Sequence, residues 1–101
     1  MGSWKGLMKM NDSQPLFSLG TIVTTRTIAE SVDAAKVASM IRSHTTGDFG
    51  VLENEDIDAN KAAIKNGDDR ILSAYVVDGE KVYVITEWDR SYTTVLFANE
   101  Y

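Results

Sequence analysis

The pattern of apolar and polar residues predicts secondary structure most clearly in the last third of the chain. Two β-prone runs, residues 70–77 and 80–88, are joined by the dipeptide Asp78-Gly79. A two-residue Asp-Gly link between such runs is the strongest short-range signal for a β-hairpin. A third apolar run, residues 93–97, follows after a short polar stretch. The pattern predicts a three-stranded antiparallel meander.

The two-residue link also predicts the register of the hairpin, because it pairs Val77 with Glu80. Counting back along both strands gives three more pairs on one face of the sheet and three on the other. These are Tyr75 with Val82, Ser73 with Val84 and Ile71 with Thr86, and then Leu72 with Ile85, Ala74 with Tyr83 and Val76 with Lys81. Both faces are largely apolar, so both need a cover. Helices supply one cover, and either strand 19–25 curling over or a partner chain supplies the other. We therefore expect a partner or a homodimer.

Upstream of the meander, residues 19–25 are rich in β-branched residues and predict a strand. Gly20 within it indicates a bulge or a close approach of two backbones. Residues 27–40 predict helix, and Asp33 is placed to cap its second part, giving two short helices with a bend. Four residues then follow at i, i+3, i+4 and i+7, the spacing of a helical stripe facing a core, and they are Val37, Met40, Ile41 and His44.

A further helix is expected to begin at Glu53 or Asn54 and to end at Asn66, before Gly67. Acidic residues fill its first turn and lysines its later turns, as the helix dipole favours. The order of elements is β-α-α-β-β-β. This order predicts an α+β fold with two to three short helices packed on one face of the sheet.

A chain of 101 residues with 44% hydrophobic and 25% charged residues has the composition of one globular domain, which we place at residues 15–101. Residues 1–14 read as a disordered N-terminal extension, whose first nine residues need not be native. No cysteine is present, no apolar run reaches the ~20 residues that span a bilayer, and the N-terminus lacks the apolar segment of a secretory signal. We expect a cytoplasmic protein without membrane contact.

The formal net charge of −5 argues against non-specific nucleic-acid binding, which needs lysine and arginine on the phosphates. The same charge is compatible with a surface that imitates nucleic acid. A single histidine among scattered carboxylates does not match metal-ligand spacing, and no phosphate-binding glycine loop is present. We expect neither a metal nor another cofactor.

His44 is the only histidine and lies near Asp48. One interpretation is a general acid or base, since the ordinary pKa of histidine is close to neutrality. The other is a structural histidine bonded to local backbone or to Asp48. Asn60, between apolar neighbours Ile57 and Ile64, is expected to bond the backbone of the loop at residues 49–50.

The densest polar cluster spans residues 86–94, which we call the rim. Its side chains could bind a phosphate or a carboxylate. Alternatively they stabilise a tight turn, with Asp89 and Ser91 bonding their own backbone and Arg90 pairing with Glu87 or Asp89. The candidate catalytic residues are His44, Asp48, Arg90, Ser91 and Thr93. The candidate binding residues are Glu87, Trp88, Arg90 and Thr94.

Five short motifs occur together between residue 16 and the C-terminus: Leu16-Phe17-Ser18-Leu19-Gly20-Thr21-Ile22-Val23, Gly47-Asp48-Phe49-Gly50, Leu72-Ser73-Ala74-Tyr75, Ile85-Thr86-Glu87, and Asp89-Arg90-Ser91 with Thr93-Thr94. In this set, with the terminal Glu100-Tyr101, the chain resembles a family of small plasmid-related bacterial proteins carried on mobile elements. The resemblance implies no established activity. The chain departs from the family pattern at Arg26-Thr27, Phe49, Trp88 and Ala98.

The leading interpretation is a small accessory protein of mobile-element origin that acts through protein contacts, without enzymatic activity. A weaker, fold-level similarity to small ribonuclease-like toxins suggests an alternative, a hydrolase or nuclease that uses His44 and the rim. A third interpretation is an acidic, nucleic-acid-mimicking inhibitor of a host defence protein.

Overall fold

The computed structural model describes residues 14–101. The expected disordered extension at residues 1–14 lies outside this part, apart from Gln14. The described elements, in chain order, are β1 (Thr21–Thr24), α2 (Arg26–Ser31), α3 (Ala34–Thr45), α4 (Asn54–Asn66), β2 (Ile71–Val77), β3 (Glu80–Thr86), β4 (Tyr92–Phe97) and the 3-10 turn η2 (Ala98–Glu100).

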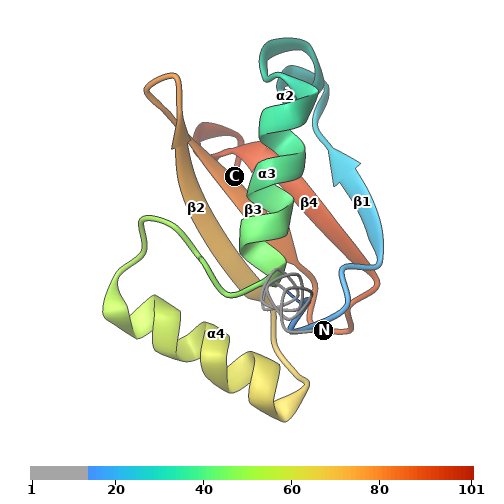
Figure 1. The fold of residues 1–101 in the computed structure, drawn as a ribbon, viewed down its shortest axis with the longest axis vertical. Coiled ribbons are helices and arrows are strands. Elements are labelled where there is room, and N and C mark those ends of the chain that lie inside the picture. Colours follow the sequence, from blue (N-terminus) through green and yellow to red (C-terminus); the bar gives the residue numbers. More distant parts are fainter. Residues whose placement is uncertain (1–13) are drawn as a thin grey trace, which may run out of the picture.

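The strands form one four-stranded sheet in the order β1-β4-β3-β2, in which β1 runs parallel to β4 (Figure 1). The predicted α+β class and the antiparallel meander β2-β3-β4 are confirmed. The hairpin has the predicted register, from Val77 opposite Glu80 to Ile71 opposite Thr86. The suggestion that residues 19–25 curl over the sheet is wrong, because β1 joins the sheet as its outer strand beside β4.

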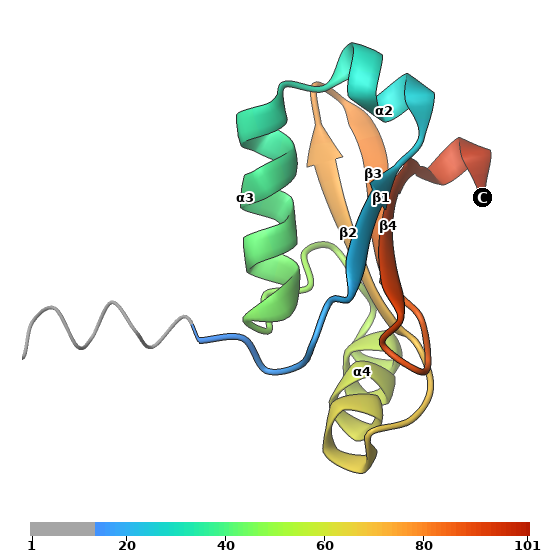
Figure 2. The same cartoon turned by 90° about the vertical axis from the view of Figure 1, so that its right-hand side faces the viewer.

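The helices cover one face of the sheet only. Figure 2 shows α3 on one side of the sheet, α2 above its upper end and α4 below its lower end, with the C-terminal segment and its short 3-10 helix η2 on the other side. The bend between α2 and α3 lies at residues 32–33, and Asp33 occupies the N-cap position of α3 without a side-chain hydrogen bond there. The helix-covered face takes the odd-numbered residues of β2 and β4 and the even-numbered residues of β3.

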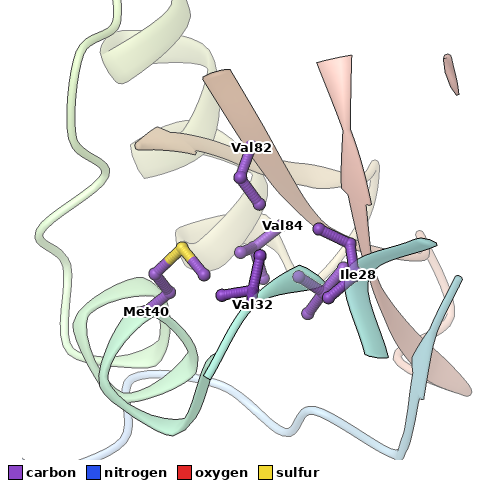
Figure 3. Close-up of a cluster of buried hydrophobic side chains, with 6 residues drawn as sticks. Ile28, Val32, Met40, Val82 and Val84 are labelled. Carbon is purple, nitrogen blue, oxygen red and sulfur yellow. The ribbon is translucent and has the colours of Figure 1, made fainter. Parts of the chain in front are cut away.

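The main core lies between this covered face and the helices α2 and α3 (Figure 3). It contains Ile28, Val32, Met40, Val82, Val84 and Val95. A second, smaller cluster packs α4 against the lower end of β2 through Phe49, Ala63 and Ile71. Burying such aliphatic side chains contributes ~1.5–3 kcal/mol each. The predicted helical stripe therefore faces the core, and its last member, His44, lies between the two clusters.

Gly20 makes the close approach that its position in the strand indicated. Its φ is +64°, and a Cβ atom there would lie 2.2 Å from the carbonyl oxygen of Ser91. A substituted side chain would meet backbone rather than a movable side chain, so only glycine fits. This contact sets β1 against the turn between β3 and β4, where Thr21 donates its backbone N–H to the Ser91 carbonyl.

Candidate functional site

His44 is fully buried, with 0% of its surface exposed, and its two ring nitrogens bond hydroxyls of the sheet. Nδ1 lies 2.6 Å from the Ser73 hydroxyl and Nε2 lies 2.8 Å from the Thr86 hydroxyl. The Thr86 hydroxyl lies 2.7 Å from that of Thr93, which donates to the carbonyl of Leu19 at 2.7 Å. The partners of His44 are therefore strand hydroxyls, and the expected bond to local backbone or to Asp48 is wrong.

The proton positions in this chain follow from its last bond. A hydroxyl has one proton, and Thr93 gives its proton to the Leu19 carbonyl, which can only accept. Thr86 must therefore donate to Thr93, and His44 must donate Nε2–H to Thr86. Nδ1 is left as an acceptor for the Ser73 hydroxyl. The geometry thus selects the neutral Nε2–H tautomer of His44.

Burial lowers the pKa of His44 from 6.5 to about 4. The cause is desolvation, which disfavours the charged imidazolium. At neutral pH the ring is therefore uncharged, as its hydrogen-bond partners require. A general base must also reach its substrate, and this ring has no exposed surface.

The segment before β1 closes this region from the side. Leu16 donates its backbone N–H to the Thr45 carbonyl, and the Thr45 hydroxyl bonds the Phe17 carbonyl. The Phe17 ring stands edge-on to the imidazole of His44, with ring centroids 5.1 Å apart. The arrangement supports a structural role for His44, in which a polar chain is buried with every member satisfied.

The remaining candidate catalytic residues do not gather around His44, except Thr93. Asp48 is exposed and accepts a bond from the backbone N–H of Gly50. Ser91 is exposed in the turn between β3 and β4. His44, Asp48 and Ser91 therefore do not line one open cleft.

Arg90 holds together three separate segments of the chain. Its guanidinium donates to the carbonyls of Ala63 at 2.9 Å, Asp69 at 2.6 Å and Trp88 at 2.9 Å. Further bonds reach the carbonyls of Asp68 and Glu87. The expected pairing with a carboxylate is wrong. Arg90 instead donates to main-chain carbonyls at the end of α4, after it, and in the β3–β4 turn. The backbone of Arg90 is left-handed, with φ +61°.

The rest of that turn follows the structural interpretation. The Asp89 carboxylate accepts the backbone N–H of Ser91 at 3.0 Å, and hydrogen bonds from Ser91 lower the pKa of Asp89. This is the local bond that stabilises Asx turns. The Trp88 carbonyl accepts a hydrogen bond from Arg90, and the Trp88 side chain is largely exposed.

Asn60 is 3% exposed and bonds a strand rather than the loop that was expected. Its side-chain N–H donates to the Leu72 carbonyl at 2.6 Å, and its side-chain oxygen accepts the Leu72 N–H at 3.0 Å. Next to it, Ala74 exchanges backbone hydrogen bonds with Phe49 and Val51. These contacts satisfy the outer edge of β2 in the way that a neighbouring strand would.

The helix-free face of the sheet is the one region where candidate binding residues are both near each other and open to solvent. It is formed by the even-numbered residues of β2 and β4 and the odd-numbered residues of β3 and β1. Four of the eight large apolar or aromatic side chains that stay exposed in residues 14–101 lie here, namely Val23, Val76, Tyr92 and Tyr101. These exposed apolar groups make the helix-free face a candidate contact surface.

A shallow pocket of about 290 Å³ lies on this face. Ile85, Thr94 and Leu96 of β3 and β4 form its floor, and the surrounding residues are Arg70, Glu87, Tyr92 and Tyr101. Two of the candidate binding residues, Glu87 and Thr94, therefore line it, whereas Trp88 and Arg90 do not. We call it the tyrosine pocket.

The C-terminal residue forms one wall of the tyrosine pocket. Arg70 lies over the Tyr101 ring, 5.5 Å from its centroid, and donates to its hydroxyl. The ring stands edge-on to Tyr83, with centroids 5.8 Å apart. Glu100 fixes the preceding turn by accepting bonds from Thr25 and from the backbone N–H of Phe97. These contacts hold the Tyr101 wall of the pocket in place.

The pocket has the chemistry to accept an apolar or aromatic side chain. Tyrosine supplies a large, rigid contact area with a polar tip. Glu87 gives one end of the pocket a carboxylate that forms no ion pair within 4 Å among residues 14–101. Sequence reasoning missed Arg70, Tyr92 and Tyr101. Strand alternation could have found Tyr92, because it puts Tyr92 on the same face as Thr94 and Leu96.

Two general findings bound the chemistry of the described part of the chain. Within residues 14–101, no three side chains of histidine, aspartate or glutamate come together in a way that could hold a metal ion. None of the helices in this same part is long and apolar enough to cross a bilayer.

Comparison with known proteins gives no family for this chain. Models of protein families, curated proteins and solved structures provide no significant match to it. The functional argument therefore rests on the geometry of the two faces of the sheet.

Proposed function

We propose that this chain is a non-enzymatic accessory protein that binds another protein through the helix-free face, with the tyrosine pocket as the centre of contact. The observation that carries the proposal is the pocket itself, an apolar floor between tyrosine walls on a face that no helix covers. Protein interfaces concentrate their binding energy in such pockets, where an aromatic or arginine anchor of the partner is desolvated.

The chemistry of the partner follows from charge. The chain carries a formal charge of −5, and the Glu87 carboxylate at the pocket lacks a cation within 4 Å among the described residues. Arg70, by contrast, is already engaged by Tyr101. We therefore assign to the site a partner protein that presents an apolar or aromatic side chain next to a lysine or arginine. Electrostatic attraction would chiefly raise the association rate.

The resemblance to plasmid-related proteins supplies the biological setting of this proposal, a cytoplasmic protein encoded on a mobile element. The hydrolase alternative has less support, because its central residue, His44, is enclosed and neutral. The mimicry alternative shares the basic partner but would need a charged surface rather than an apolar pocket.

A displayed library of random peptides can test the site without knowledge of the natural partner. Selection on the wild-type protein should enrich peptides with a large apolar residue beside a lysine or arginine. Thr94→Arg, which fills the pocket floor with a charged side chain, should abolish their binding. Ala38→Arg, which adds the same charge on the exposed side of α3, should leave it unchanged.

Glu87→Gln tests the charge component separately, because it keeps the shape of the side chain. Binding should weaken and lose part of its salt dependence. The proposal is refuted if no peptide is enriched, or if enriched peptides bind the Thr94→Arg variant as well as the wild-type protein.

A further inference from the structure

The two edges of the sheet differ in how well they are covered, and neither edge is part of the proposed contact face. On the β2 edge, Asn60 and the segment around Gly50 occupy the main-chain groups of Leu72 and Ala74. A Cβ atom on Gly50 would lie 1.9 Å from the Ala74 carbonyl oxygen, which shows how closely this edge is covered. On the opposite edge, β1 is the last strand, and no element of residues 14–101 lies beyond it (Figure 1).

Proteins usually protect an exposed edge strand by keeping it very short, or with a charge, a proline or a bulge. β1 is short, with four residues, but its sequence Thr21-Ile22-Val23-Thr24 contains neither a charge nor a proline. Ile22 is 47% exposed and Val23 is 44% exposed. An uncharged, β-branched edge strand of this kind is a template for the addition of another strand.

The hydrogen bonds of β1 determine which of its groups are available. Thr21 and Thr25 donate their N–H groups to carbonyls on the β4 side, at 3.1 Å each. Because backbone groups alternate in direction along a strand, Val23 also points toward β4, and Ile22 and Thr24 point outward. The outward groups are therefore placed symmetrically about Val23.

From this placement we infer that β1 pairs with β1 of a second copy of the chain, antiparallel and across a two-fold axis at Val23. In this register Ile22 exchanges two hydrogen bonds with Thr24 of the partner subunit, and Thr24 exchanges two with the partner's Ile22. Val23 faces the partner's Val23 in the non-hydrogen-bonded position, where Cα atoms are ~4.5 Å apart. The result is a continuous eight-stranded sheet.

The β1 edge is a place where a second copy meets no like charge. The chain is acidic, with a net charge of −5, so most surfaces of two copies repel. The β1 strand is uncharged along its whole length, and its self-pairing places no like charges opposite each other. A two-fold axis perpendicular to the sheet also keeps both helix layers on one side and both helix-free faces on the other. The tyrosine pockets of the two copies therefore stay open, and this dimer does not depend on the proposed function.

Sedimentation equilibrium over a range of concentrations tests the dimer. The weight-average mass of the wild-type protein should rise from 11.2 kDa towards twice that value. Ile22→Pro removes an outward N–H that has no partner within its own subunit, and proline is tolerated at such edge positions. This variant should stay at the monomer mass, as should Val23→Lys, which places two ammonium groups across the axis.

Val76→Lys serves as the matched control, because Val76 lies on the helix-free face of β2, away from β1. It should dimerise as the wild-type protein does. Amide exchange gives a second readout: the Ile22 and Thr24 amides should gain protection as concentration rises, and they should lose it in Val23→Lys. A wild-type protein that remains monomeric at millimolar concentration overturns the inference. So does an Ile22→Pro or Val23→Lys variant that is folded and still dimeric.

Discussion

The two faces of the sheet differ in residue type and in exposure. The helix-covered face carries the hydroxyls of Ser73, Thr86 and Thr93, which form one buried chain of hydrogen bonds with His44 of α3. The helix-free face contains tyrosines and aliphatic side chains, several of which remain exposed around a pocket. His44 and Thr93, two of the side chains that suggested catalysis, are thus enclosed, whereas several apolar side chains of the helix-free face are accessible. Residue type alone is therefore a poor guide to function, because a polar side chain can act on a ligand only where it is exposed.

The largest effect on stability is expected when the His44 side chain is removed from beneath the helix-covered face. His44→Ala should lower the free energy of unfolding by about 3–4 kcal/mol, because it leaves a cavity and two hydroxyls without their partner. Urea denaturation followed by circular dichroism measures the change. A loss below 1 kcal/mol would mean that the buried chain of hydrogen bonds contributes little, and the contrast between the faces would fail.

A second test uses pH, and its sign follows from the pKa of His44. The pKa is about 4 in the folded protein and 6.5 in the reference state. Between these values the unfolded chain binds a proton that the folded chain does not, so stability falls as pH is lowered from about 6.5 to 4. The gap corresponds to about 3 kcal/mol. Urea denaturation at several pH values measures this loss.

His44→Gln is the control for the pH experiment, since an amide can bond hydroxyls but does not titrate. The pKa values of Asp89 and Glu100 are also lowered, by hydrogen bonds from Ser91 and from the Phe97 N–H respectively. Their stabilisation is lost only at more acidic pH and in both proteins. The difference between wild type and variant therefore isolates His44, and equal pH profiles would contradict its burial as a neutral ring.

The smallest effect is expected on the helix-free face. Val76 is 60% exposed, and Val76→Thr keeps the β-branched shape that suits a strand. Its free energy of unfolding should change by less than about 0.5 kcal/mol. The same urea experiment measures it. A change comparable with that of His44→Ala would show that the helix-free face is part of the monomer's core rather than a contact surface.

Local signals made the hairpin and the helices predictable. The Asp78-Gly79 link determines the register of β2 and β3 by geometry alone, and Asn66-Gly67 marks the end of α4. The parallel pairing of β1 with β4 joins residues ~70 positions apart. Neither strand carries a local sequence signal that identifies the other as its neighbour. The placement of β1 could therefore not be derived from its own sequence.

The candidate site also had parts that were predictable from the sequence and parts that were not. The sequence placed Ser73 and Thr86 on one strand face and His44 on the core side of its helix, so their meeting could have been inferred from the predicted register. The five carbonyl partners of Arg90 could not, because main-chain acceptors leave no mark in the sequence. The pocket was partly within reach through Glu87 and Thr94, but its wall depends on the C-terminal turn that brings Tyr101 back to Arg70.

Asn60 also has a consequence for how large an assembly of this chain can become. By occupying the main-chain groups of Leu72, with residues 49–51 beside it, its side chain leaves the sheet one edge at which it can grow. When that edge pairs with its own copy, the contact is symmetric and consumes the growing edge of both molecules. Association then stops at two, whereas a sheet open at both edges would add molecules without end and form a fibre.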